Sequence, residues 1–188
     1  MEEIKKLQII ENTDNNALQL NQFEDGLKQV LALHSLPTEG IFVDVSQRLN
    51  VFKNLESVLV QITESEKNQS IYLAKFIASV ASGLFDASLN YLWDETILQI
   101  RKRVSQYDIE FFYDNAVTGD RRKRLKDEND LDKVDDYDLI RGAKEIGLIS
   151  DLGFKHLEYI NFMRNWASAA HPNNSEITGL QLVSWLET

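Results

Sequence analysis

Cysteine is absent from this 188-residue chain, and proline, glycine and long apolar runs are scarce. Without cysteine the protein has no disulfide framework, no thiolate metal site and no cysteine nucleophile. Two prolines and eight glycines are too few for the many tight turns of an all-β fold. No apolar run in the sequence approaches the roughly 20 residues that a membrane-spanning helix needs. The N-terminus does not look like a signal peptide either, so we expect a cytoplasmic protein.

Acidic residues outnumber basic ones by 30 to 20, which gives a formal net charge of −10. This balance argues against nonspecific coating of nucleic acid, because that affinity comes from many lysine and arginine contacts with phosphates. The net charge is still compatible with a compact, locally basic site that binds nucleic acid. The charge is unevenly distributed: residues 101–126 hold eight Lys or Arg against four acids, whereas residues 127–140 hold seven acids against one base.

Apolar residues recur at helical spacing along most of the chain, and no alternating apolar run is long enough for a convincing strand. We therefore predict an all-α fold, a helical bundle with a long spine helix. Residues 1–70 are expected to be an N-terminal helical extension and residues 71–188 a helical domain, although one compact domain is also compatible. The abrupt end at Thr188 suggests a piece of a longer chain. Helices are expected over residues 15–34, 44–63, 71–104, 137–146, 150–170 and 175–186.

The spine helix is predicted from Ile71 to about Val104, with Ser70 as its N-cap. Gly83 falls inside it and marks a kink, a helix break or a close packing contact. A helix of this length needs partners on more than one side, so it is expected to run through the middle of the bundle. Residues 108–117 either extend it or form a short separate turn.

The stretch from residue 120 to 136 is highly charged and poor in large apolar side chains, which predicts an exposed, mobile loop. A basic run within it is a candidate RNA contact. The adjacent acidic stretch from Asp127 favours the alternative, in which the basic run forms ion pairs instead. The basic run consists of Arg121, Arg122, Lys123 and Arg124.

Arg164 and His171 are seven residues apart on the helix predicted from residue 150, so both lie along one face. Pro172 disfavours the helical conformation at His171 and ends the helix there, where a substrate can reach the imidazole ring. Three polar residues accompany the pair, namely Asn161, Asn165 and Ser168. The residues expected to face inward are Leu152, Tyr159, Ile160, Met163, Trp166, Ala167 and Ala170.

Arginine and histidine together meet the minimum for cleaving RNA without a metal. A guanidinium group suits a phosphate, and an imidazole group moves a proton near neutral pH. Cleavage needs a base for the 2′-hydroxyl, a cation for the phosphoryl oxygens and an acid for the leaving oxygen. Because one histidine cannot easily fill both proton roles, a second copy across a two-fold axis is expected.

The order Arg164, Asn165, short spacer and His171 near a helix end resembles the RNase motif of the HEPN superfamily. The resemblance covers about residues 71–186 and leaves residues 1–70 unaccounted for. Members of that superfamily are small helical bundles that dimerise and place both Arg/His pairs in one cleft. Many are metal-independent endoribonucleases of toxin–antitoxin, abortive-infection and other anti-phage systems.

The resemblance implies that Arg164 and His171 are catalytic and that Asn165 supports them. It implies an RNA substrate, a homodimer and an antitoxin or sensor partner, with no cofactor and no metal. The alternative is a non-catalytic helical module of a larger defence protein, which dimerises or holds a partner, because an Arg and a His at this spacing also arise by chance on helix surfaces.

Overall fold

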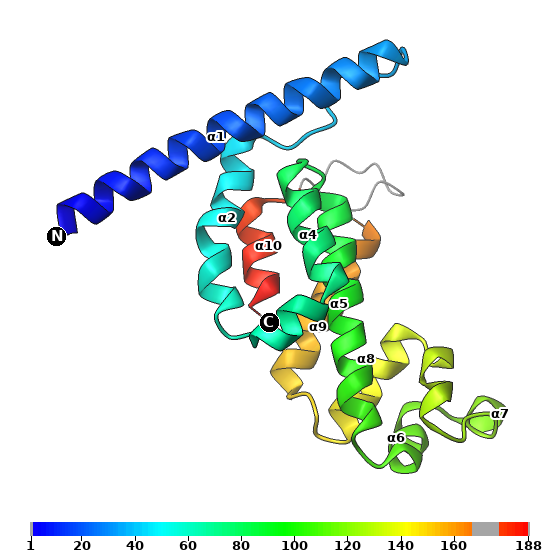
Figure 1. Cartoon of the computed structure of the whole chain (residues 1–188). Coiled ribbons are helices and arrows are strands. Elements are labelled where there is room, and N and C mark those ends of the chain that lie inside the picture. Colours follow the sequence, from blue (N-terminus) through cyan, green and yellow to red (C-terminus); the bar gives the residue numbers. More distant parts are fainter. Residues whose placement is uncertain (1, 167–176, 188) are drawn as a thin grey trace. The chain divides into compact units, whose positions relative to one another are not determined.

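In a computed structural model that describes residues 2–166 and 177–187, the chain forms ten α-helices and one 3-10 helix (Figure 1). No strand occurs among these residues, which confirms the all-α prediction. None of the described helices has the length and apolar character that crossing a membrane requires. The contacts group residues 2–91 with 177–187 in a first unit and residues 92–166 in a second. The division of the chain at residue 70 stays a prediction.

The first unit is built around α2, with α10 packed along it and α1 in contact with it (Figure 1). Close approach of α10 depends on Gly179, because a Cβ atom there would clash with the Gln47 carbonyl oxygen. The Gly179 backbone N–H donates to Gln47 Oε1 at 3.0 Å. The buried apolar core of this unit includes Val51, Phe76, Val80 and Leu182. Its helices are α1 (Glu2–Leu33), α2 (Val45–Leu59), α3 (Glu64–Gln69), α4 (Ile71–Ala81), the start of α5 (Phe85–Ser105) and α10 (Gly179–Leu186).

The helix starts follow the cap residues of the sequence. Ser70 is confirmed as the N-cap of α4, because its hydroxyl accepts the Leu73 N–H at 3.0 Å. Thr63 and Glu66 form a capping box that starts α3, a helix absent from the sequence-based prediction. The capping-box residues that mark its start were present in the sequence. The six residues of α3 are all polar, however, so no apolar residues at helical spacing indicated a helix.

The predicted single spine over residues 71–104 is wrong, because the chain breaks into α4 and α5 at Gly83. Gly83 has φ +72°, a left-handed conformation that suits glycine and ends the helix. Its carbonyl accepts the Val43 N–H at 2.9 Å. A side chain there would meet the buried Arg48, because a Cβ atom would lie 2.6 Å from Arg48 Nε. Of the three possibilities for Gly83, helix break and close packing both apply.

The second unit packs α8 against α6 and α9. Residues 108–117 form a separate helix, α6, which starts at Asp108, whose carboxylate accepts the Phe111 N–H at 3.1 Å. Gly142 allows α8 to approach α6 closely at Phe112 and Ala116. The elements of this unit are the remainder of α5, α6 (Ile109–Ala116), α7 (Gly119–Arg122), η1 (Glu128–Lys133), α8 (Asp136–Glu145) and α9 (Asp151–Trp166).

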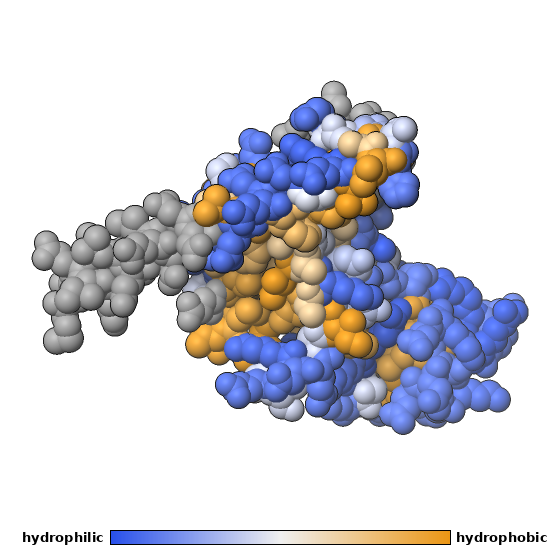
Figure 2. All heavy atoms as spheres, turned by 45° about the horizontal axis from the view of Figure 1, so that its top comes forward, coloured by the Kyte–Doolittle hydropathy of each residue, from blue (hydrophilic) through white to orange (hydrophobic). Residues whose placement is uncertain are grey.

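The stretch from residue 120 to 136 is largely exposed, as its charge predicts, but it is not a loop throughout. It contains part of α7 and all of η1, and three apolar side chains anchor it in the second unit. Its polar surface surrounds this small apolar base, and Figure 2 shows mostly hydrophilic residues over α7 at the lower right. The loop prediction is wrong because three well-placed apolar residues suffice to hold a short, irregular segment. These are Leu125, Leu131 and Val134.

The predicted inward face of α9 is also largely wrong. Ile160 is buried as expected, but Leu152, Tyr159 and Trp166 are exposed. The buried positions are Phe154, Leu157 and Ile160. Helix α9 carries two apolar faces, and the sequence pattern alone favoured the one that contains more aromatic residues. Ala167 and Ala170 lie outside the described residues.

Candidate functional site

Arg164 lies in the last turn of α9, on the side of the helix that packs into the second unit. Its Nη1 is 3.8 Å from Asp136 Oδ2. The guanidinium carbon lies 5.8 Å from the centre of the Trp93 ring, within the range of a cation–π contact. The side chain remains 29% exposed, so the guanidinium group is held in position and still reaches solvent.

Asp136 is the residue on which the surrounding groups converge. Trp93 Nε1 donates to its Oδ2 at 2.7 Å, and Arg101 Nη2 donates weakly to its Oδ1 at 3.5 Å. With Arg164, these residues form what we name the Asp136 cluster: Trp93, Arg101, Asp136 and Arg164. It joins α5, α8 and α9 within the second unit.

Local sequence explains how Asp136 comes to this position. Asp135 caps α8 by accepting the Asp138 N–H at 2.9 Å, which makes Asp136 the first helical residue. A carboxylate is favoured in the first turn of a helix by the helix dipole. The hydrogen bond from the Asp138 backbone and the ion pair with Arg121 outweigh burial and lower the pKa of Asp135. The cap therefore stays ionised, and α8 begins at a fixed residue.

Arg101 is the second cation of the cluster. It also donates to the Val134 carbonyl oxygen at 3.3 Å, and its Nε lies 3.8 Å from Asp132 Oδ1. Asp132 is 88% exposed, so that contact is weak. The Arg101 Nε atom is buried and has no hydrogen-bond acceptor within the part of the chain that the structure describes. Arg101 thus keeps unused donor capacity at a partly exposed site.

The remaining residues of the predicted site divide into two groups. Asn161 and Asn165 lie on α9 next to Arg164, and the Asn165 amide donates to Asn161 Oδ1 at 3.4 Å. His171 and Ser168 lie outside the described residues, so the pairing of Arg164 with His171 stays a prediction. Asp136 and Trp93 were missed as site residues. The only signal for Asp136 in the sequence was its place in a run of acidic residues, and such a run usually indicates a solvent-exposed surface.

The basic run forms ion pairs in the structure. Arg121 pairs with Asp135 and Asp138 at 2.8 and 3.0 Å, which confirms the expected pairing with the acidic stretch. Arg122 and Lys123 pair instead with acids that precede the run, at 2.6 and 2.8 Å, namely Asp114 and Asp120. Contact of this run with RNA stays a prediction.

Tyr113 is part of the same network. Its hydroxyl donates to the Asp127 carbonyl oxygen at 2.8 Å, and Arg122 lies over its ring at 5.7 Å. Burial and the neighbouring carboxylates of Asp130 and Asp127 raise the pKa of Tyr113 to about 12. The tyrosine is therefore a neutral structural group that ties the charged segment down, rather than an acid or base for chemistry.

Within residues 2–166 and 177–187, no group of three or more His, Cys, Asp or Glu is placed to hold a metal ion. The chemistry that the described site offers is the binding of an anion by two guanidinium groups beside an indole. The fold and the cluster thus define an all-α protein with a candidate anion site at the end of α9. Comparisons with protein-family models, curated proteins and solved structures find no match for this chain.

Proposed function

We propose that the protein is a metal-independent endoribonuclease of the HEPN type, acting as a homodimer in phage defence or in a toxin–antitoxin system. The position of Arg164 carries this proposal. Its side chain is partly exposed, and the separation of 3.8 Å between its Nη1 and Asp136 Oδ2 is longer than a hydrogen bond. A phosphate oxygen offers a shorter, charge-assisted bond and can take the place of this contact.

In this mechanism Arg164 binds the scissile phosphate and stabilises the charge that develops on its oxygens. His171 accepts the proton of the 2′-hydroxyl, whose oxygen then attacks the adjacent phosphorus. The bond from phosphorus to the 5′-oxygen breaks, and His171 of the second copy protonates that oxygen. The products are a 2′,3′-cyclic phosphate and a free 5′-hydroxyl.

Arg164→Ala and His171→Ala are each expected to lower the rate of RNA cleavage by about 100-fold, because each removes a group that acts on the transition state. The measurement is cleavage of a mixed RNA substrate in the presence of a chelator, with analysis of the product ends. Lys155→Ala is the matched control, since Lys155 lies on α9, is 71% exposed and pairs with Glu158 at 2.6 Å. Helix content by circular dichroism verifies that the variants fold. Cleavage that survives in both variants, or that the chelator abolishes, rules the mechanism out.

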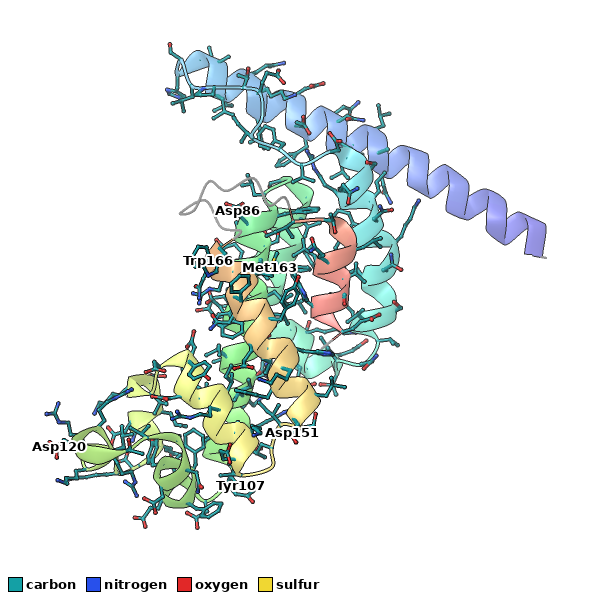
Figure 3. The ribbon with its side chains drawn as sticks, turned by 180° about the vertical axis from the view of Figure 1, so that it is seen from behind. Asp86, Tyr107, Asp120, Asp151, Met163 and Trp166 are labelled. Atoms are coloured by element: carbon teal, nitrogen blue, oxygen red, sulfur yellow. The ribbon has the colours of Figure 1, made fainter. Side chains whose placement is uncertain are left out.

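A second candidate function is that of a non-catalytic module that associates with a second copy of itself. The exposed face of α9 favours it, because Leu152, Tyr159 and Trp166 follow one another at intervals of seven residues. The Phe162 ring lies 5.8 Å from that of Trp166 on the same side. Figure 3 shows Asp151 at the start of α9 and Met163 and Trp166 near its end. A heptad of apolar residues is typical of a helix that packs against another helix.

This second candidate is tested by Leu152→Glu combined with Phe162→Glu, which places two charges on the exposed α9 face. We expect the apparent mass in light scattering to fall from dimer to monomer at micromolar concentration, since burying each charge costs more than the apolar contact it replaces. Leu180→Glu is the matched control, because Leu180 is 65% exposed on α10 and Leu152 is 66% exposed. An unchanged mass for the double variant, or an equal loss in the control, removes this face as the interface.

A further inference from the structure

Two arginines from two different helices converge on one carboxylate in the Asp136 cluster. Arg101 on α5 reaches Oδ1 at 3.5 Å, and Arg164 on α9 reaches Oδ2 at 3.8 Å. Neither contact has the short, parallel geometry of a bidentate arginine–carboxylate pair. Among the described residues, the short bond to Asp136 comes instead from the Trp93 indole N–H at 2.7 Å. Asp136 is thus anchored by Trp93 and only loosely paired with the two guanidinium groups.

This arrangement leaves binding capacity for a further anion. Both arginine side chains are partly exposed, 25% for Arg101 and 29% for Arg164. The buried Arg101 Nε has no acceptor among the described residues, although a guanidinium group normally uses its donors when it is removed from water. The two anionic oxygens of a backbone phosphate can accept hydrogen bonds from two guanidinium groups together. A cation–π contact with the Trp93 ring helps to hold the Arg164 guanidinium group in place.

We propose that Arg101 and Arg164 form a binding site for a backbone phosphate of RNA and that Asp136 is the internal counter-ion which this phosphate replaces. The inference rests on the proposed function for the choice of RNA as the ligand. In the free protein Asp136 holds the two guanidinium groups close to the geometry that they need. When RNA binds, Asp136 keeps the Trp93 N–H, and the phosphate takes the guanidinium donors. Asp136 therefore limits the affinity of the site while it keeps the site ordered.

The test measures binding of a fluorescent 2′-O-methyl RNA by anisotropy at several salt concentrations. This RNA cannot be cleaved by attack of a 2′-hydroxyl, so binding is read independently of catalysis. Asp136→Asn is expected to tighten binding by about fivefold, because it removes the competing charge of a partly exposed ion pair. The asparagine amide oxygen can still accept the Trp93 N–H, so the anchor of the cluster is retained. Asp151→Asn is the matched control, with the same change in net charge at a side chain that is 90% exposed and pairs with Lys144 at 3.4 Å.

Arg101→Gln provides the second arm. It is expected to weaken binding and to lower the salt dependence of the binding constant by about one ion, the signature of a lost phosphate contact. Equal affinities for Asp136→Asn and Asp151→Asn overturn the inference, as does a salt dependence that Arg101→Gln leaves unchanged. Displacement of the RNA by stoichiometric inorganic phosphate overturns the assignment to RNA. If the expected binding pattern occurs without any cleavage of ordinary RNA, the phosphate site stands and only the nuclease function fails.

Discussion

Arg48→Met is expected to lower the free energy of unfolding of the first unit by about 3–5 kcal/mol, as is usual when one partner of a buried ion pair is removed. Arg48 lies on α2, is only 1% exposed and forms an ion pair with Glu24 of α1. Its Nε also donates to the Val43 carbonyl oxygen at 2.7 Å. Methionine fills much of the volume but supplies no donor, so Glu24 and the Val43 carbonyl both lose a partner. The measurement is urea unfolding followed by circular dichroism.

Acid provides an independent check on the same ion pair. Burial works to raise the pKa of Glu24, but hydrogen bonds from Lys28 and Arg48 outweigh it and hold the pKa below its ordinary value. A lowered carboxylate pKa contributes stability above the pH at which unfolded glutamate titrates, and this contribution is lost as the pH falls through the folded-state pKa. The wild type should therefore lose more stability between neutral pH and pH 3 than Arg48→Met does.

The control for Arg48→Met is Arg103→Met, which makes the same change at an exposed position of α5. Surface substitutions of this kind usually alter stability by no more than about 0.5 kcal/mol. A similarly small effect for Arg48→Met would show that the pair with Glu24 does not hold α1 to α2. If the wild type and Arg48→Met lost equal stability in acid, the charge on Glu24 would not contribute to holding α1 against α2.

Gly83→Ala is expected to destabilise the first unit by about 2–4 kcal/mol. The left-handed conformation at φ +72° accounts for about 1–2 kcal/mol of this in any residue with a Cβ. The remainder comes from overpacking, because the new Cβ would lie 2.6 to 2.7 Å from three atoms of the Arg48 guanidinium group. Since that guanidinium group is fixed by Glu24 and Val43, it cannot move aside freely.

A double-mutant cycle separates these two contributions. In an Arg48→Ala background the clashing atoms are gone, so Gly83→Ala should cost only the conformational part, about 1–2 kcal/mol. Gly147→Ala serves as the matched control, because Gly147 has φ +79° and no atom within contact distance of a Cβ. The cycle contradicts the packing interpretation if Gly83→Ala costs the same in both backgrounds, or no more than Gly147→Ala in the wild type.

The amino-acid sequence by itself determined the fold class and several helix starts. Ser70, Ser150 and Gly147 act where the sequence places them, because a cap forms hydrogen bonds with backbone groups only a few residues away. That Arg164 lies on a helix was equally predictable, since apolar residues recur at helical spacing from residue 150 onward. Such features depend on the local geometry of the backbone, which residues close together in the sequence determine.

Tertiary structure alone decided which apolar face of α9 is buried, where the spine breaks and which groups surround Arg164. Phe154 and Tyr159 are both good core residues, and only packing within the second unit selects Phe154. Asp136 becomes the centre of the cluster because Trp93, 43 positions away in the sequence, donates to it. These outcomes depend on contacts between distant segments, whose free energies arise only after the helices have packed, and no local pattern records them.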